Sequence, residues 1–290
     1  NVSSGTGTIT KLVVTDAGTA FPSCVSIHDA SQQLTGGLSV DGNVYSLDIS
    51  TPIDTAGGDV AIDSSYLTLS KDINSGSGSQ TYGTDTNISL LNDLNLTTST
   101  GVAGDIGIHI QGPVDSFSSP SALYLHSESV KVDDAIGSTT PLKTLTVVTE
   151  NDAAQRGQFY QSVHTVGDQN YEAGLTSGDV EFNGTYISSG GDIHLVGAGT
   201  DGVVLSLTGD TQIDVGTGEF SVQKGSSVSY PGGNIISQGG SQNLTIQAGN
   251  ITVPAGIGVD PSLTGVELND FTINGAGQGW SEHASGCYIW

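Results

Sequence analysis

Asp133 and Asp134 are the only two acidic residues that stand next to each other in this chain. Paired carboxylates can supply the acid and the base of glycoside hydrolysis, and enzymes that cut acidic polysaccharides add Lys or Arg as base or clamp. The nearby residues that could complete such a site are His126, Lys131 and Lys143. No Arg-x-Lys or His-Gly element accompanies them. We therefore interpret the pair as a solvated corner and expect no catalytic residues.

Metal-binding patterns are weak. The six histidines are dispersed with no His-x-x-x-His pair, which argues against a zinc or iron site. Residues 197–203 read Gly-Ala-Gly-Thr-Asp-Gly-Val, a partial match to the nonapeptide that binds Ca²⁺ between successive turns of a β-helix. Because that motif works in tandem, one near match makes Asp201 only a weak candidate ligand. Ca²⁺ is the one cofactor that the sequence leaves open.

A short corner motif recurs along the chain: glycine, then an acid or its amide, then a β-branched or aromatic residue. Such a corner predicts a turn that feeds a half-buried strand. Its irregular recurrence indicates one unit stacked on itself, as in a β-solenoid. The seven occurrences begin at Gly58, Gly104, Gly178, Gly191, Gly218, Gly233 and Gly249.

Composition supports an all-β chain and limits its partners. The 290 residues include 42 glycines and no methionine, and no stretch of ten or more residues shows a convincing 3.6-residue apolar period. Thirty acids against six bases give a net charge of −24, which argues against nucleic acid and acidic lipid as partners. No segment approaches the roughly 18 apolar residues of a membrane span. The start at Asn1 is what we expect of a processed, secreted protein.

The strand pattern suggests three parts. We expect residues 1–40 to form an N-terminal cap or first coils, residues 41–275 a β-solenoid, and residues 276–290 a C-terminal cap or docking tip. Within the solenoid, residues 149–178 break the rhythm and predict an irregular contact loop, with a boundary between two subdomains as the alternative. Clean alternation elsewhere, as in Tyr66-Leu67-Thr68-Leu69, predicts strands such as 60–69 and 219–222. The contact-loop candidates are Arg156, Phe159, Tyr160 and Tyr171.

The C-terminal aromatics allow two interpretations. Trp280 and Trp290 either plug the last coil or, with Tyr288 and Ile289, form an assembly interface, since aromatic residues concentrate in interface cores.

Residues 110–184 carry a family resemblance. They contain Gln-Gly-Pro-Val at 111–114, Asp-Ala-Ile-Gly-Ser-Thr-Thr-Pro-Leu at 134–142 and Val-Gly-Asp-Gln-Asn-Tyr at 166–171. This pattern resembles the repeats of bacterial surface proteins of the filamentous-haemagglutinin and autotransporter-passenger type. The resemblance implies a right-handed parallel β-helix and an exported adhesin or fibre. The asparagine-proline motifs of two-partner secreted haemagglutinins are missing, which leaves the export route open.

The two cysteines, Cys24 and Cys287, stand near opposite ends of the chain. Secreted proteins favour disulfides, but a β-helix rises roughly 4.8 Å per coil and a disulfide needs Cα atoms within about 7 Å. In one straight coil the two thiols therefore cannot meet. Three alternatives remain: head-to-tail pairing between subunits, two unpaired buried thiols, or a compact fold that brings the ends together.

These observations favour a secreted, non-enzymatic structural or adhesive β-solenoid at the cell surface. We expect it to assemble head to tail into a filament and to contact cell-surface glycans, without nucleic acid and without membrane insertion. The runner-up is a polysaccharide-binding or polysaccharide-degrading β-helix. A third alternative is a pair of β-sandwich domains.

Overall fold

In the computed structural model, the described part of the chain is all-β, and its strands stack in parallel as a β-solenoid of about nine turns. The structure describes residues 12–14, 24–27, 34, 36–99, 106–150, 157–174, 178–197, 202–226, 232–238, 240–253, 256–257, 268 and 270–274. The predicted parallel β-helix is thus confirmed as a parallel β-solenoid. The β-sandwich alternative is wrong, because every pairing between the named strands is parallel, whereas sandwiches are built from antiparallel sheets.

The chain divides into two units, residues 1–142 and 143–290, which are described separately. The strands of the first unit are β1 (Leu12–Val14), β2 (Cys24–Ile27), β3 (Leu38–Ile49), β4 (Ile53–Asp54), β5 (Val60–Leu69), β6 (Ile73–Asn74), β7 (Gln80–Tyr82), β8 (Asn87–Leu90), β9 (Leu94–Thr97), β10 (Ile108–Ile110), β11 (Val114–Ser116), β12 (Leu123–Ser127) and β13 (Val130–Val132).

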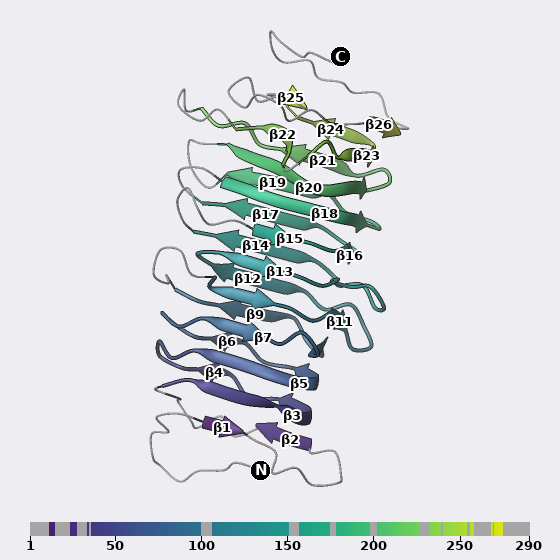
Figure 1. Ribbon diagram of the computed structural model, residues 1–290. Helices are drawn as coiled ribbons and strands as arrows, with labels where there is room; N and C mark the ends of the chain where they lie inside the picture. The colour runs from purple at the N-terminus through teal and green to yellow at the C-terminus, as the bar shows by residue number, and fades with distance from the viewer. Residues whose placement is uncertain are drawn as a thin grey trace. The chain divides into compact units, whose positions relative to one another are not determined.

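The second unit repeats this organisation (Figure 1). Its strands are β14 (Leu145–Thr149), β15 (Gly157–Phe159), β16 (Val163–Thr165), β17 (Gln169–Ala173), β18 (Gly178–Ser188), β19 (Ile193–Gly197), β20 (Val203–Asp214), β21 (Glu219–Val222), β22 (Asn234–Ser237), β23 (Asn243–Gln247), β24 (Asn250–Thr252), β25 (Gly256–Ile257) and β26 (Asp270–Asn274).

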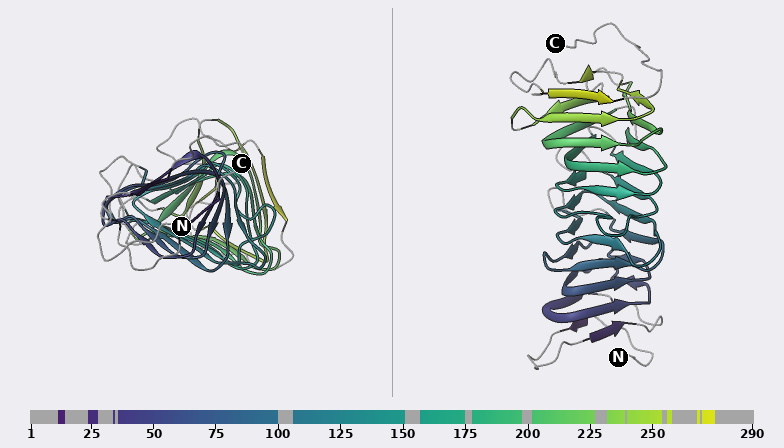
Figure 2. Two further views of the ribbon diagram at one scale, coloured as in Figure 1. Left: turned by 90° about the horizontal axis from the view of Figure 1, so that it is seen from below. Right: turned by 90° about the vertical axis from the view of Figure 1, so that its right-hand side faces the viewer.

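Each unit is wound in coils that carry strands on three sides. In the first unit, β10, β11 and β12 form one coil, and they pair with β7, β8 and β9 of the coil before it. Long strands cover two sides: the first half of β5 pairs with β7 and its second half with β8. Figure 2 shows the strands of each unit lying one above the next. The coil length varies, because Val60 pairs with Gln80, 20 positions on, and Ile108 with Val130, 22 positions on.

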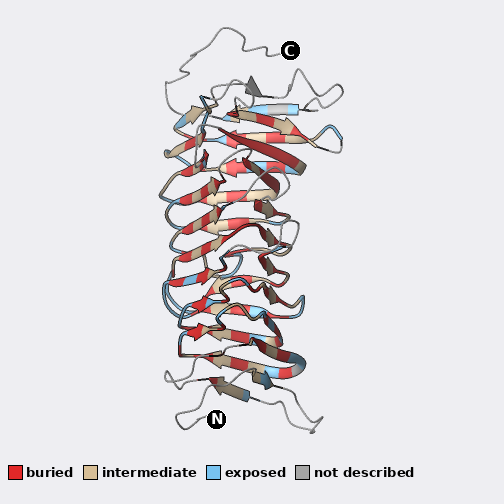
Figure 3. Cartoon of the chain, turned by 90° about the vertical axis from the view of Figure 1, so that its left-hand side faces the viewer, coloured by how far each residue is buried: buried red, intermediate tan, exposed pale blue. Residues whose placement is uncertain are grey.

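The core lies inside the coils and follows from the alternation of the strands. Strand β5 alternates buried and exposed residues along most of its length, with Val60, Ile62, Leu67 and Leu69 turned inward. Figure 3 shows the same alternation of buried and more exposed residues along the coils. The strand register then places mostly aliphatic side chains above one another. One inward column contains Leu38, Val60, Gln80, Ile108 and Val130. Burial of these aliphatic side chains provides the main driving force for folding.

The sequence located several strands and misjudged one region. Strands at 60–69 and 219–222 are confirmed. The irregular contact loop over 149–178 is wrong for the residues described there, because they form β15, β16 and β17, which pair in register with neighbouring coils. Phe159 and Tyr171 are buried core residues rather than contact residues. In the first part, β1 and β2 both pair with β3.

Candidate functional site: polar ladders at the coil corners

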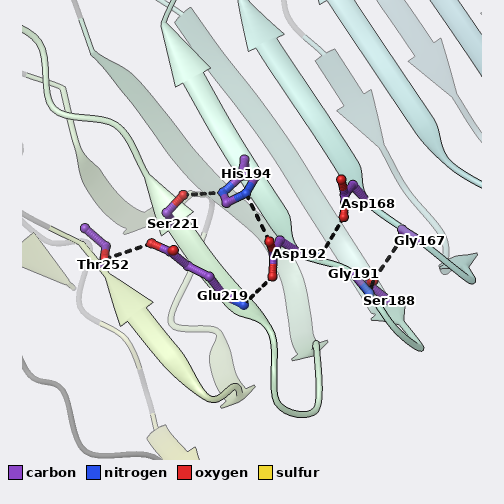
Figure 4. Close-up of polar contacts among 9 residues, drawn as sticks. All are labelled: Gly167, Asp168, Ser188, Gly191, Asp192, His194, Glu219, Ser221 and Thr252. Carbon is purple, nitrogen blue, oxygen red and sulfur yellow. Dashed lines mark hydrogen bonds and ion pairs between the residues drawn. The ribbon is translucent and has the colours of Figure 1, made fainter.

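The recurring glycine-acid corner has a structural explanation that Gly191-Asp192-Ile193 illustrates (Figure 4). Asp192 donates its backbone N–H to Oδ1 of Asp168, one coil earlier, at 3.0 Å. A Cβ at position 191 would collide with that same carboxylate oxygen and with the Asp168 backbone. Glycine is therefore needed so that the carboxylate of the preceding coil can approach the chain where strand β19 begins.

The acidic residue of the motif accepts a backbone N–H of the next coil in the same way. Asp192 Oδ1 accepts the backbone N–H of Glu219 at 2.6 Å, and Glu219 Oε1 accepts the hydroxyl of Thr252 at 3.1 Å. Asp168, Asp192 and Glu219 thus form one continuous ladder along the corner of the second unit. We call this kind of contact, from a carboxylate to the next coil, a corner ladder. Its carboxylates satisfy N–H groups at the strand starts.

Corner ladders also occur elsewhere in both units. Each uses a carboxylate to accept a backbone N–H 20 to 33 residues later, at 2.8 to 3.0 Å. The pairs are Asp59 with Ser79, Asp72 with Asn95, Asp93 with Ala122, Asp115 with Thr139 and Thr140, and Asp210 with Asn243. These are hydrogen bonds to charged acceptors, so ionised carboxylates help to align one coil on the next.

Asp210 shows the electrostatic consequence of such a contact. The backbone N–H of Asn243 and the amide of its side chain both donate to this carboxylate. These two donors hold the pKa of Asp210 below its usual value, in spite of a small opposing effect of desolvation. Protonation would neutralise the carboxylate and weaken its hydrogen bonds to Asn243, so the strength of this corner contact depends on pH.

One corner also brings together a serine, a histidine and an acid. His194 Nδ1 lies 2.6 Å from Oγ of Ser221, its register partner on β21, and His194 Nε2 lies 3.6 Å from Oδ2 of Asp192. Hydrolytic triads place the serine and the acid on the two imidazole nitrogens, each at hydrogen-bond distance. Here the histidine–aspartate separation exceeds a hydrogen bond. The geometry fits a polar cross-link between strands on the outer face of the coil.

The second polar cluster joins His109, Lys131 and Asp133 on the outer face of the first unit. His109 Nε2 lies 2.6 Å from Asp133 Oδ2, and Lys131 Nζ lies 3.0 Å from Asp133 Oδ1. Partial burial works against ionisation of Asp133, but the hydrogen bonds and charges of His109 and Lys131 outweigh it and lower the pKa of Asp133. The cluster binds β10 to the end of β13.

This cluster shows what the sequence missed. Asp133 is partly buried rather than a fully solvated corner, and its histidine partner is His109. No sequence signal points to this contact, because His109 and Lys131 are register partners 22 positions apart whereas another coil repeats after 20 positions. A basic residue and an imidazole beside a carboxylate are groups that the predicted polysaccharide enzyme would use, so that alternative stays a prediction.

The predicted site residues that the structure describes lie in different environments and form no common site. Cys24 is exposed on β2 and forms no disulfide with any residue that the structure describes. Tyr160 is half-buried and donates its hydroxyl to Glu181 at 3.2 Å, whereas Phe159 and Tyr171 lie in the core. The remaining candidates lie outside the described residues: Arg156, Asp201, Trp280, Cys287, Tyr288, Ile289 and Trp290.

Two further searches covered the described residues. Within these ranges, no cluster of three or more His, Cys, Asp or Glu side chains is arranged to hold a metal ion. The Ca²⁺ site at Asp201 stays a prediction. Over the same part of the chain, no helix has the length and apolar character needed to cross a bilayer.

In comparisons with protein-family models, with curated proteins and with solved structures, nothing matches this chain. The parallel β-solenoid is consistent with the class of β-helix surface proteins that the sequence resembles.

Proposed function

We propose that this chain is a secreted, non-enzymatic β-solenoid that serves as a structural or adhesive subunit at the cell surface. In this proposal it is similar to filamentous-haemagglutinin and autotransporter-passenger repeats, and it assembles end to end into an extracellular fibre. Its partners are further copies of itself and cell-surface glycans.

The observation that carries this proposal is that many carboxylates are engaged in hydrogen bonds between coils. The corner ladders engage carboxylates of both units in hydrogen bonds from one coil to the next. Side chains that could serve catalysis are thus used to align coils. An architecture that repeats the same backbone ladder and the same corner contact is suited to an extended, load-bearing body.

Assembly follows from the nature of a parallel solenoid. Its first and last coils present strand edges whose N–H and C=O groups can pair with another chain. A head-to-tail contact between such ends is heterologous, so it propagates into a filament. Cys24 is an exposed thiol in the first described coil, where a disulfide to Cys287 of the next subunit would reinforce the contact.

Negative-stain electron microscopy of the purified chain, under oxidising and reducing conditions, tests the proposal. We expect long uniform fibres, with ladders of covalent oligomers on non-reducing gels that disappear in Cys24→Ser. Fibres of Cys24→Ser would show that strand pairing alone is sufficient for assembly. Dispersed particles under every condition, together with release of reducing sugar from glycans, would contradict the proposal and favour the polysaccharide enzyme.

A further inference from the structure

Two tyrosines of the first unit are exposed where most described aromatic rings are buried. Tyr45 on β3 and Tyr66 on β5 retain 44% and 49% of their surface, and their ring centroids lie 5.2 Å apart at 65°. By contrast, Tyr82, Tyr171 and Tyr186 are fully buried. An exposed pair of rings in contact is a feature of interaction surfaces, because aromatic residues are enriched in protein interfaces.

The strand register fixes this pair on the outside of the coil. Tyr66 lies opposite Ser46 of β3 on one side and opposite Asn87 of β8 on the other. Leu67, its neighbour in β5, points inward and is fully buried, so the Tyr66 ring projects outward from the sheet. Asn87 in turn donates its side-chain amide to the backbone oxygens of Ser65 and Asp85, which ties the third coil to this site.

An exposed aspartate precedes the tyrosine site on each of three successive coils. Asp41 lies four residues before Tyr45, Asp63 three residues before Tyr66, and Asp85 two residues before Asn87, the register partner of Tyr66. The position of Asp63 is set by two glycines: a Cβ added at Gly42 or at Gly83 would lie 2.6 Å from its carboxylate oxygens. The carboxylate therefore lies against the backbone of both neighbouring coils.

The charge and the rings together identify the chemistry of a partner. A guanidinium can stack on a tyrosine ring by a cation–π contact and can donate two hydrogen bonds to a carboxylate. Asp63 and Tyr66 are three residues apart on β5, at most about 10 Å along the strand, so the long side chains of two arginines on one extended peptide can contact both of them. The chain's net charge of −24 would attract a basic partner and repel anionic glycans.

We propose that Tyr45, Tyr66 and Asp63 form a docking site for an extended, arginine-bearing segment of a partner protein. This site lies on the outer face of β3 and β5, two strands that already pair with neighbouring coils, so it does not use the free strand edges on which end-to-end assembly would depend. Arginine is preferred over lysine there, because only the planar guanidinium can stack on the rings and bond the carboxylate bidentately.

The test uses the full chain and a fluorescein-labelled (Arg-Gly)4 peptide, whose binding is measured by fluorescence anisotropy at two salt concentrations. A (Lys-Gly)4 peptide is the chemical control. We expect Tyr45→Ala and Tyr66→Ala each to weaken (Arg-Gly)4 binding about two- to fivefold, as loss of an exposed cation–π contact predicts. Asp63→Asn keeps the side-chain shape and should weaken binding in the same direction.

Two matched variants separate this site from general charge attraction. Phe117→Ala removes another exposed ring of the first unit, and Asp134→Asn removes one unit of negative charge from the same unit. Both should leave binding of (Arg-Gly)4 unchanged. Equal binding by wild type, Tyr45→Ala and Tyr66→Ala would overturn the proposal, since the peptide would then sense only the net charge. Equal affinity for the arginine and lysine peptides would also overturn it, as would loss of neutral-glycan binding alone in the tyrosine variants.

Discussion

The two units contain the same buried polar arrangement on different strands. In the first unit, Gln80 of β7 donates its side-chain amide to the backbone oxygens of Ile73 and Thr97, and accepts the hydroxyl of Tyr82 at 2.9 Å. In the second unit, Gln169 of β17 donates to the oxygens of Val163 and Ile187 and accepts the hydroxyl of Tyr171 at 3.0 Å. Each glutamine therefore spans a coil corner from inside the core.

The packing around this arrangement differs between the units. Within the described residues, no other ring contacts Tyr82, whereas Tyr171 packs edge-on against Phe159 and Phe182 at centroid distances of 5.1 and 5.0 Å. Phe182 also stacks on Tyr186 at 3.7 Å. The Gln-x-Tyr corner is therefore a polar element common to both units, while the side chains that fill the coil interior beside it differ.

Truncation of the aromatic cluster gives the largest expected effect. Phe182→Ala removes the ring that contacts three other aromatic side chains, and we expect a loss of about 3–5 kcal/mol in the free energy of unfolding. The measurement is urea unfolding followed by circular dichroism. Phe117→Ala, at an exposed ring, should change stability by less than about 0.5 kcal/mol. Similar losses in both variants would show that the cluster is not a core.

Removal of one hydroxyl from each unit tests whether the Gln-x-Tyr corners are equivalent. Tyr82→Phe and Tyr171→Phe each take away the donor that faces a buried glutamine oxygen, and we expect each to cost about 1–3 kcal/mol. Tyr66→Phe is the exposed control and should be close to neutral. A substantial cost for one buried tyrosine and none for the other would break the equivalence of the two corners.

The pH dependence of stability should show two limits with different origins. Burial raises the pKa of Tyr82 and of Tyr186, and burial together with the charge of Tyr186 raises the pKa of Tyr171. An unfolded tyrosine loses its proton near pH 10 while the buried one does not. The stabilisation is therefore complete below pH 10 and is lost as the pH rises above about 10.

The acid limit is weaker and involves the outer surface. The lowered pKa values of Asp133 and Asp210 mean that the unfolded chain binds protons first as the pH falls. Their contribution is present above the usual aspartate value of about 3.9 and is lost as the pH falls through the lower folded values. Thermal unfolding across the pH range checks both limits, and Asp210→Asn should flatten only the acid limb. An unchanged acid limb in that variant would argue against a stabilising role for the Asp210 contact.

Alternation of apolar and polar side chains allowed some strands to be predicted from the sequence but not others. Val60, Ile62, Leu67 and Leu69 are apolar at inward positions, so the strand was predicted with the right bounds. In β15 and β17, Gly157 and Gln169 occupy inward positions, and neither is an apolar side chain. The alternation of apolar and polar residues is therefore interrupted there, which is why the sequence predicts a contact loop where core aromatic residues lie.

The corner motif was visible in the sequence, but its purpose was not. Glycine followed by an acid predicts a turn from backbone preference alone. Gly191 makes room for the carboxylate of Asp168, and Asp192 accepts the backbone N–H of Glu219. The two contacts join residues 24 and 27 positions apart, so local sequence does not reveal them.

By itself, the sequence determined the all-β class, the stacking of one repeated unit and the position of several corners, because these follow from local preferences, from alternation along one strand and from the recurring motif; the parallel direction of the strands was implied by the family resemblance. Only the tertiary structure decided which residues from different coils meet: His109 with Asp133, Tyr45 with Tyr66, and the rings around Phe182. The physical reason is the uneven coil length. A register of 20 residues in one coil and 22 in another leaves no fixed period from which such pairs can be read.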